Sequence, residues 1–292
     1  MCSALGRSHP AAAAVLAQAD EVLGFPLSRL MAEGPDAELT ATRNAQPAIL
    51  AHSVAALAVL AERLGPVAMA AGHSLGEFSA HVAAGTLSFQ DALEAVRLRG
   101  ELMWEAGRAR PGAMAAVLGL EDAALEEACA GVTAGVCVPA NFNSAGQIVV
   151  SGDVAGVEQG MSIFSQAGAK RVVRLNVSGA FHSPLMEPAA RGLREKLESV
   201  DFQDPAYPVF ANVTAGPVTS AARARELLVE QLTSPVRWAA SVSAMVASGA
   251  DRFLEVGPGS VLCGLNKRNA KGLPCTSVGE PGDIQVFQGV TT

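Results

Sequence analysis

The chain has 292 residues, of which 50% are hydrophobic and 17% are charged, a composition typical of a globular protein with one or two domains. The formal net charge of −7 argues against general binding to nucleic acids, whose phosphate backbone is recognised by basic surfaces. The longest apolar segment, residues 45–61, is short and interrupted by polar residues, so we expect no membrane span.

The cysteines are scattered along the chain and form no Cys-x-x-Cys pair: Cys2, Cys129, Cys137, Cys263 and Cys275. Such thiols are typical of a protein in a reducing compartment. The alanine-rich residues 11–17 continue into a polar helical segment, which argues against a signal peptide. We therefore expect reduced thiols and a cytoplasmic location.

The first third of the chain alternates helical and strand patterns. Helices are predicted over residues 10–24, 46–64, 75–84 and 88–106, and a buried strand over residues 67–71. Pro10 suits the first turn of a helix, and glycines follow the predicted helix ends. This alternation predicts an α/β layer with a parallel sheet.

Arg-Pro-Gly at residues 110–112 marks a break, after which the elements are shorter. Strands are predicted over residues 113–118, 136–142, 147–151 and 171–177, and helices over 122–130 and 154–167. The order β-α-β-β-α-β is that of a ferredoxin-like subdomain. The α/β pattern then returns, with helices over 184–199, 222–232, 236–248 and 260–267 and strands over 209–212 and 253–256. We therefore predict one discontinuous domain of residues 1–111 and 177–292, with residues 112–176 inserted as a second.

Gly72-His73-Ser74-Leu75-Gly76 lies at the turn between the predicted strand and a predicted helix. A serine between glycines at such a turn is a nucleophile elbow, in which a strained backbone exposes the hydroxyl. The helix start adds unpaired N–H groups and a positive dipole end, which favour a developing oxyanion. The pattern and its context predict that Ser74 is a nucleophile.

Arg99 lies in the middle of the apolar face of the 88–106 helix, on the same stripe as Val96 and Met103. An arginine that points into the protein requires a carboxylate or phosphate partner. A structural ion pair, or a side chain that reaches the rim, is the alternative. Beside a nucleophilic serine, we expect a bidentate clamp for an acidic substrate.

His182 is the best candidate for the base that Ser74 requires, because it follows a predicted strand and precedes a helix that begins with proline. His73 adjoins Ser74, but neighbours across an elbow point apart. Since no carboxylate partner for His182 is evident, a backbone carbonyl can orient its ring instead. No metal-binding motif occurs in the sequence, and we expect neither a metal nor a cofactor.

Six short motifs follow one another in a fixed order: Asn-Ala-Gln-Pro-Ala at 44–48, Gly-His-Ser-Leu-Gly-Glu at 72–77, Arg-Gly at 99–100, Asn-Phe-Asn-Ser at 141–144, Gly-Ala-Phe-His-Ser at 179–183 and Glu-Val-Gly-Pro-Gly at 255–259. With these motifs the sequence resembles the malonyl-CoA:acyl-carrier-protein transacylase family from about residue 5 to about residue 280. The resemblance implies an α/β-hydrolase-like parallel-sheet domain with an inserted ferredoxin-like subdomain.

The resemblance also implies a role for each site residue. Ser74 takes the malonyl group as an ester, and His182 serves as general base and then as acid to the leaving thiol. Arg99 clamps the free malonyl carboxylate, and the main chain of Gln231 orients the imidazole. The Leu75 N–H is an oxyanion donor. The other implied substrate-binding residues are Phe181, which is typical of malonyl-using members, Gln46 and Met103.

The implied partners are malonyl-CoA and acyl carrier protein, in fatty-acid or polyketide synthesis. Acyl carriers are acidic, so an acidic enzyme requires a local basic patch to bind them. The candidates for this patch are Lys170, Arg171, Arg174, Lys267 and Arg268.

The sequence departs from this family in one feature. Members normally begin with a strand and a Gly-Gln-Gly-Ser turn that supplies a second oxyanion donor, and the sequence contains no such turn. Loss of one oxyanion donor lowers turnover by roughly 100–1,000-fold. Two alternatives therefore stay open: a truncated relative that is weakly active or non-catalytic, and a serine esterase or thioesterase that uses water as the acceptor.

Overall fold

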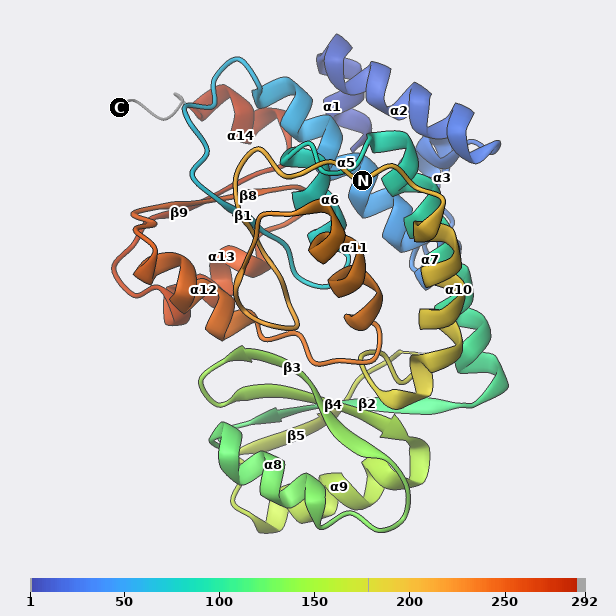
Figure 1. The fold of residues 1–292 in the computed structure, drawn as a ribbon, viewed down its shortest axis with the longest axis vertical. Helices are drawn as coiled ribbons and strands as arrows, with labels where there is room; N and C mark the ends of the chain where they lie inside the picture. The colour runs from blue at the N-terminus through green and yellow to red at the C-terminus, as the bar shows by residue number, and fades with distance from the viewer. Residues whose placement is uncertain (1, 178, 288–292) are drawn as a thin grey trace.

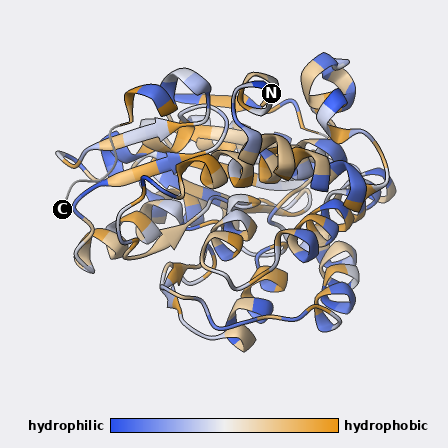
Figure 2. Ribbon diagram, turned by 90° about the horizontal axis from the view of Figure 1, so that it is seen from above, coloured by the Kyte–Doolittle hydropathy of each residue, from blue (hydrophilic) through white to orange (hydrophobic). Residues whose placement is uncertain are grey.

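The computed structural model describes residues 2–177 and 179–287 (Figure 1). A larger part, rich in helices, lies above a smaller part in which two helices cover one face of a sheet. Hydrophilic and hydrophobic residues are mixed along the helices of the molecule (Figure 2). None of the helices in the described ranges has the length and apolar character needed to cross a bilayer.

The helices of the larger part are α1 (Ser3–Ser8), α2 (Pro10–Leu23), α3 (Leu27–Glu33), α4 (Asp36–Leu39), α5 (Thr42–Leu60), α6 (Gly76–Ala83), α7 (Phe89–Ala109), α10 (Glu187–Glu198), α11 (Ala221–Glu230), α12 (Trp238–Ala247), α13 (Val261–Asn269) and α14 (Pro281–Val286), with the 3-10 helix η1 (Pro184–Met186) before α10. The long helices α5 and α7 pack on each other. A Cβ atom at Gly100 of α7 would lie only 2.7 Å from the Arg43 Cα of α5, so glycine permits this close approach.

Helix α5 begins one turn earlier than predicted and contains Pro47 in its interior. A proline has no N–H to donate to the carbonyl four residues before it. The carbonyl freed in this way belongs to Arg43, and it accepts a hydrogen bond from Arg97 Nη1 of α7 at 3.0 Å. The neighbouring helix therefore compensates for the missing bond, which the sequence pattern did not indicate.

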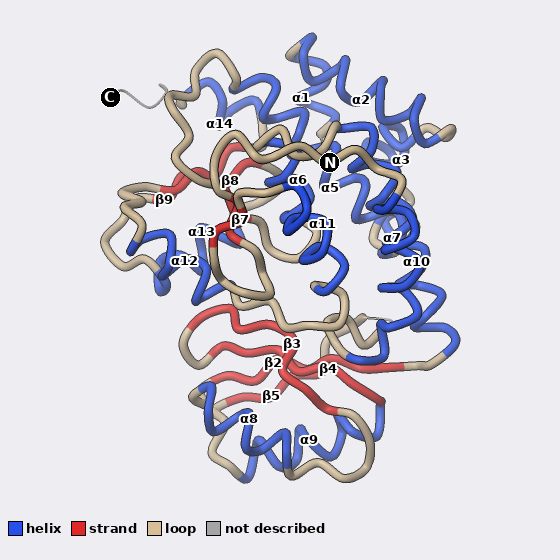
Figure 3. The backbone as a smooth tube through the Cα atoms, viewed as in Figure 1, coloured by secondary structure: helices blue, strands red, loops and turns tan. Residues whose placement is uncertain are grey.

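The strands of the larger part form two small sheets (Figure 3). The strands predicted over 67–71 and 209–212 are shorter than expected, whereas the one over 253–256 has the predicted bounds. Strand β1 (Ala70–Ala71) pairs in parallel with β6 (Val209–Phe210), which pairs antiparallel with β7 (Pro217–Val218). Strand β8 (Phe253–Val256) pairs in parallel with β9 (Cys275–Val278). The predicted parallel pairing is present in both sheets, but no strand in the described ranges bridges β1 and β8, so the parallel strands are divided between two sheets.

The smaller part contains β2 (Gly112–Leu118), α8 (Asp122–Ala130), β3 (Cys137–Ser144), β4 (Gln147–Asp153), α9 (Val154–Gln166) and β5 (Arg171–Arg174). Its strands are antiparallel in the order β3-β4-β2-β5, which is the ferredoxin-like arrangement. Helices α8 and α9 pack on one face of this sheet. The other face buries Met114, Ala140 and Val149 against Phe181 of the larger part. The predicted α/β fold class is confirmed, while the domain boundaries stay a prediction.

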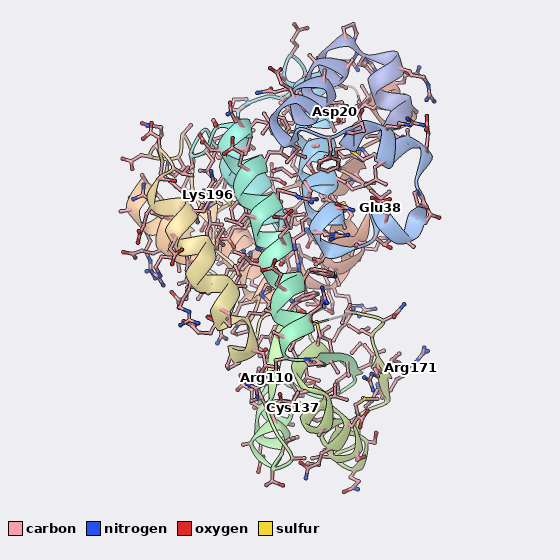
Figure 4. All side chains as sticks on the ribbon, turned by 90° about the vertical axis from the view of Figure 1, so that its right-hand side faces the viewer. Asp20, Glu38, Arg110, Cys137, Arg171 and Lys196 are labelled. Atoms are coloured by element: carbon pink, nitrogen blue, oxygen red, sulfur yellow. A yellow bond between two sulfur atoms is a disulfide. The ribbon has the colours of Figure 1, made fainter. Side chains whose placement is uncertain are left out.

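The two parts are joined at the end of α7. Arg110, which follows this helix (Figure 4), forms a bidentate ion pair with Asp153 at the end of β4. Its Nε donates to Asp153 Oδ1 at 2.9 Å, and its Nη2 donates to Oδ2 at 3.0 Å. A second ion pair, between Lys196 of α10 and Glu94 of α7 at 2.7 Å, holds these two helices together. Both pairs are partly exposed, so each contributes about 1 kcal/mol or less to stability.

The expectation of reduced cysteines was wrong for one pair. Cys263 of α13 and Cys275 of β9 form a disulfide, with Cα atoms 5.4 Å apart. The two residues are close because α13 packs against β9, a contact that spacing along the chain did not reveal. Cys2, Cys129 and Cys137 are free and buried.

Candidate active site

Ser74 lies at the sharp turn between β1 and α6, with φ at +50°, a left-handed conformation that is strained for a residue with a side chain. The turn is tight: a Cβ atom at Gly72 would lie 1.9 Å from the carbonyl of Gly76. Asn212, two residues after β6, clamps this turn through its side-chain amide. Its Oδ1 accepts from the Ser74 N–H at 2.6 Å, and its Nδ2 donates to the Gly72 carbonyl at 2.7 Å.

His182 also has a left-handed backbone, with φ at +57°. Its Nε2 lies 2.8 Å from Ser74 Oγ, and its Nδ1 lies 2.8 Å from the main-chain oxygen of Gln231. Because a carbonyl oxygen only accepts, Nδ1 carries the proton, and Nε2 is left to accept the hydrogen bond from the Ser74 hydroxyl. Burial, and then the positive charge of Arg99, lower the pKa of His182 to about 3, so the imidazole is neutral and able to act as a base.

Arg99 of α7 is buried, with 1% of its surface exposed. Its Nη1 donates to Gln46 Oε1, and its Nη2 donates to Ser74 Oγ at 3.1 Å and to Gln231 Oε1 at 2.9 Å. Burial lowers the pKa of Arg99 to about 10, so the guanidinium still carries its charge at neutral pH. Its partners in the described ranges are neutral oxygens, so the charge has no carboxylate in contact with it.

Gln46 and Met103 contact each other beside Nη1 of the Arg99 guanidinium. Gln46 Nε2 donates to Thr42 Oγ1 at 2.8 Å and contacts Met103 Sδ at 3.4 Å. These contacts fix the side-chain amide of Gln46 so that its oxygen faces Arg99. The structure therefore brings both residues into the predicted site.

Leu75 and Phe181 each adjoin one of the two central residues. The Leu75 N–H stands at the start of α6 and has no hydrogen-bond partner within the described ranges, as an oxyanion donor requires. Phe181 is half-buried and packs against Met114 and Ala140 on the sheet of the smaller part. It therefore lies at the junction of the two parts, beside His182.

Two residues of this site were missed in the sequence, Glu77 and Asn212. The Glu77 side chain is buried, and its Oε2 accepts from Gln231 Nε2 at 2.7 Å and from the Asn212 N–H at 3.0 Å. Glu77 stood inside one of the motifs, but a carboxylate in the first turn of a helix is usually exposed. Asn212 is the last residue of the strand predicted over 209–212 and lies two residues beyond β6, so its place at the end of a strand was the available signal for it.

His73 does not share in this hydrogen-bond network around Ser74. Its Nε2 lies 2.8 Å from Asn143 Oδ1, and its ring packs at a tilt against Trp238. Burial lowers the pKa of His73, so this imidazole is neutral as well. The structure agrees with the expectation that neighbours across the elbow point apart.

A cavity of about 450 Å³ opens beside His182, between the smaller part and the segment that precedes α12. Its lining includes Phe142 of β3, Pro184, Thr233 and Arg237. No group of three or more His, Cys, Asp or Glu side chains within residues 2–177 and 179–287 is arranged to hold a metal ion.

The predicted basic residues gather chiefly at one end of the small sheet. Arg171 lies in the same cross-strand row as Gln147, and Arg268 Nη1 donates to Gln147 Oε1 at 2.9 Å. Arg171 is exposed at this end of the molecule (Figure 4). Lys170, which precedes it in the sequence, and Lys267, which precedes Arg268, are exposed as well. Arg174 differs from them, because it forms an ion pair with Glu158 at 2.7 Å.

A family model and a curated relative that are similar to this chain are both acyl transferases. The family model described as "Acyl transferase domain" matches residues 1–283. The malonyl CoA-acyl carrier protein transacylase of Bacillus subtilis (strain 168) is 47% identical over 279 residues, which cover 95% of this chain and 88% of the relative.

Two solved structures are similar over nearly the whole chain. The acyl carrier protein S-malonyltransferase from Vibrio cholerae gives a TM-score of 0.95 at 41% identity, and the match covers 98% of this chain and 94% of that one. A malonyl-transacylase in complex with its type II PKS acyl-carrier protein gives a TM-score of 0.93 at 40% identity, with 99% and 94% covered.

Proposed function

The chain belongs to the acyl transferase domain family, and we propose that it transfers a malonyl group from malonyl-CoA to the phosphopantetheine thiol of acyl carrier protein. The similar relative from Bacillus subtilis and the similar structure from Vibrio cholerae carry the names of malonyl transferases. The site supports this reaction, because a neutral base and an unneutralised cation both lie within hydrogen-bond distance of the nucleophile.

In the first half-reaction, Ser74 Oγ attacks the thioester carbonyl of malonyl-CoA while His182 Nε2 takes the hydroxyl proton. The free Leu75 N–H, at the positive end of α6, stabilises the oxyanion of the tetrahedral intermediate. When the intermediate collapses, the C–S bond breaks and His182 returns the proton to the departing thiolate. The products are coenzyme A and a malonyl ester of Ser74.

In the second half-reaction the roles are reversed. The thiol of the carrier's phosphopantetheine gives its proton to His182 and attacks the malonyl ester. The proton then passes to Ser74 Oγ as the C–O bond breaks, and the enzyme is restored. The exposed basic residues Lys170, Arg171 and Lys267 support docking of an acidic carrier beside the site.

Arg99 is the observation that carries the choice of substrate. Its buried guanidinium binds only neutral oxygens and stands 3.1 Å from the nucleophile, so it provides a charged site at about the distance of a malonyl carboxylate. A neutral acyl group offers this cation no partner, and a buried unpaired charge is costly. The same argument disfavours an esterase for neutral substrates.

We place the reaction in the cytoplasm and assign it no cofactor.

Mass spectrometry of the intact protein after incubation with malonyl-CoA tests the proposal. The wild type should gain one malonyl group, Ser74→Ala none, and Arg99→Ala should be malonylated about 100-fold or more slowly. Arg108→Ala, an exposed position on the same helix, is the matched control and should react at the wild-type rate.

Adding carrier protein with its phosphopantetheine should discharge the malonyl group onto the carrier thiol. Discharge by water at the same rate would support a thioesterase instead. A folded wild-type protein that gains no malonyl group would contradict malonyl transfer and support a non-catalytic relative.

A further inference from the structure

Glu77 is a buried acid that makes no hydrogen bond to Ser74 Oγ or His182. It bonds instead to Asn212 and Gln231, which hold the Ser74 backbone and the His182 ring. It stands in the first turn of α6, and its side chain is fully buried. Oε2 accepts two hydrogen bonds, from Gln231 Nε2 at 2.7 Å and from the Asn212 N–H at 3.0 Å. Oε1 has no partner among the described residues. One carboxyl oxygen therefore joins two segments that are more than 130 residues away in sequence.

Both of these partners hold the reacting groups. The side-chain amide of Gln231 has a donor end and an acceptor end. Its Nε2 donates to Glu77 Oε2 at 2.7 Å and to the main-chain oxygen of Ser74 at 3.0 Å, so these two acceptors together fix which way the amide points. With Nε2 held by Glu77, the amide oxygen faces Arg99 Nη2 at 2.9 Å. The main-chain oxygen of the same residue binds His182. Asn212 in turn clamps the backbone that leads into the nucleophile, at the Gly72 carbonyl and the Ser74 N–H.

Arg99 is the one charged side chain close to Glu77 in the described part of the site. The imidazoles around it come from His182, from His73 before the elbow and from His81 on the same helix, and burial lowers the pKa of each. The Gln231 amide therefore bridges a guanidinium on one side and a carboxyl group on the other. Burial raises the pKa of Glu77 to about 7, although its two hydrogen bonds and the charge of Arg99 act in the opposite direction.

We propose that Glu77 is a positioning residue that orients Gln231 and Asn212, and that its carboxylate and the malonyl carboxylate compete for the charge of Arg99. This inference rests on the proposed malonyl transfer. In the empty enzyme an ionised Glu77 balances the guanidinium through the Gln231 amide. When the malonyl carboxylate occupies the guanidinium, the second negative charge favours protonation of Glu77, so binding takes up a proton.

The sign of the pH dependence follows from this competition. The malonyl-bound enzyme holds the Glu77 proton more tightly than the free enzyme does. Raising the pH through about 7 therefore weakens malonyl binding, and KM for malonyl-CoA rises. The limiting increase is about tenfold for each unit by which the bound malonyl group raises the Glu77 pKa.

Glu77→Gln is the informative variant, because its amide oxygen can still accept both hydrogen bonds while the titrating charge is gone. KM and kcat for malonyl transfer should be measured from about pH 6 to about pH 8.5, with thermal melting as a check on folding. We expect the rise in KM to disappear in Glu77→Gln and to persist in Glu105→Gln, an exposed carboxylate on α7. An unchanged KM profile in Glu77→Gln would overturn the proposal.

Proton uptake by the wild type provides a test that needs no variant. Malonylation of Ser74 by malonyl-CoA itself releases and consumes no net proton, so a pH indicator in weak buffer near pH 7 reports only coupled groups. We expect uptake of a fraction of one proton per malonyl group, and none with acetyl-CoA. Malonylation without proton uptake would refute the role of Glu77, whereas absence of malonylation would refute the proposed function itself.

Discussion

Alanine at Gly72 should disrupt the nucleophile elbow, whereas alanine at Gly76 should be tolerated. A Cβ atom at Gly72 would lie 1.9 Å from the Gly76 carbonyl and 2.5 Å from the Glu77 nitrogen, so the start of α6 must move by roughly 1.5 Å to restore normal contact distances. Such overpacking costs about 1–3 kcal/mol. Losing the two clamping bonds from Asn212 adds about 1 kcal/mol each, so we expect a loss of about 3–5 kcal/mol.

Gly76 is the matched control, because a Cβ atom there meets nothing within 4 Å and its φ is not left-handed. Alanine at this position reduces the freedom of the unfolded chain and should add about 0.5 kcal/mol of stability. Urea denaturation followed by circular dichroism measures both changes, and the rate of malonylation reports the elbow geometry. If Gly72→Ala unfolds at the same urea concentration as Gly76→Ala and reacts as fast, the elbow is not the constrained turn described above.

Two further predictions concern stability. His81 is fully buried with neither ring nitrogen bonded to a described residue, and burial lowers its pKa to about 4. The unfolded chain therefore binds a proton first as the pH falls below about 6.5, and stability drops by about 3 kcal/mol by pH 4. His81→Leu should lose about 3 kcal/mol less over this range in urea titrations, and an equal loss in variant and wild type would contradict the assignment. The Cys263–Cys275 disulfide closes a loop with a sequence separation of 12 and should contribute about 3 kcal/mol, so reductant should lower the urea midpoint of the wild type but leave that of Cys275→Ser unchanged; an insensitive wild type would refute the pairing.

Local features of the sequence predicted most helices and the whole smaller part. The predicted 122–130 helix coincides with α8, and the hairpin of β3 and β4 lies where strands were predicted over 136–142 and 147–151. Ser74, Arg99 and His182 were also recognisable, since each has a distinctive local context: a turn, an apolar helix face and a loop after a strand. The structure brings these three side chains within hydrogen-bond distance of one another or of a shared partner.

Contacts between distant segments account for what could not be predicted. Glu77 is buried only because Gln231 and the Asn212 backbone approach it from segments that lie more than 130 residues further along the chain. The Pro47 position inside α5 depends on a donor from α7. The disulfide likewise depends on the packing of α13 against β9. None of these features has a local signal, because each depends on which elements meet in three dimensions.

The partners of Arg99 explain how one site can hold a cation and keep it available. A carboxylate in direct contact would satisfy the guanidinium, but the malonyl carboxylate would then have to displace it. Gln46 and Gln231 instead supply amide oxygens, which accept the N–H donors and leave the positive charge unneutralised. The counter-charge of Glu77 acts only through the Gln231 amide. This arrangement reduces the cost of burying the guanidinium and still leaves a charged acid substrate as its best direct partner.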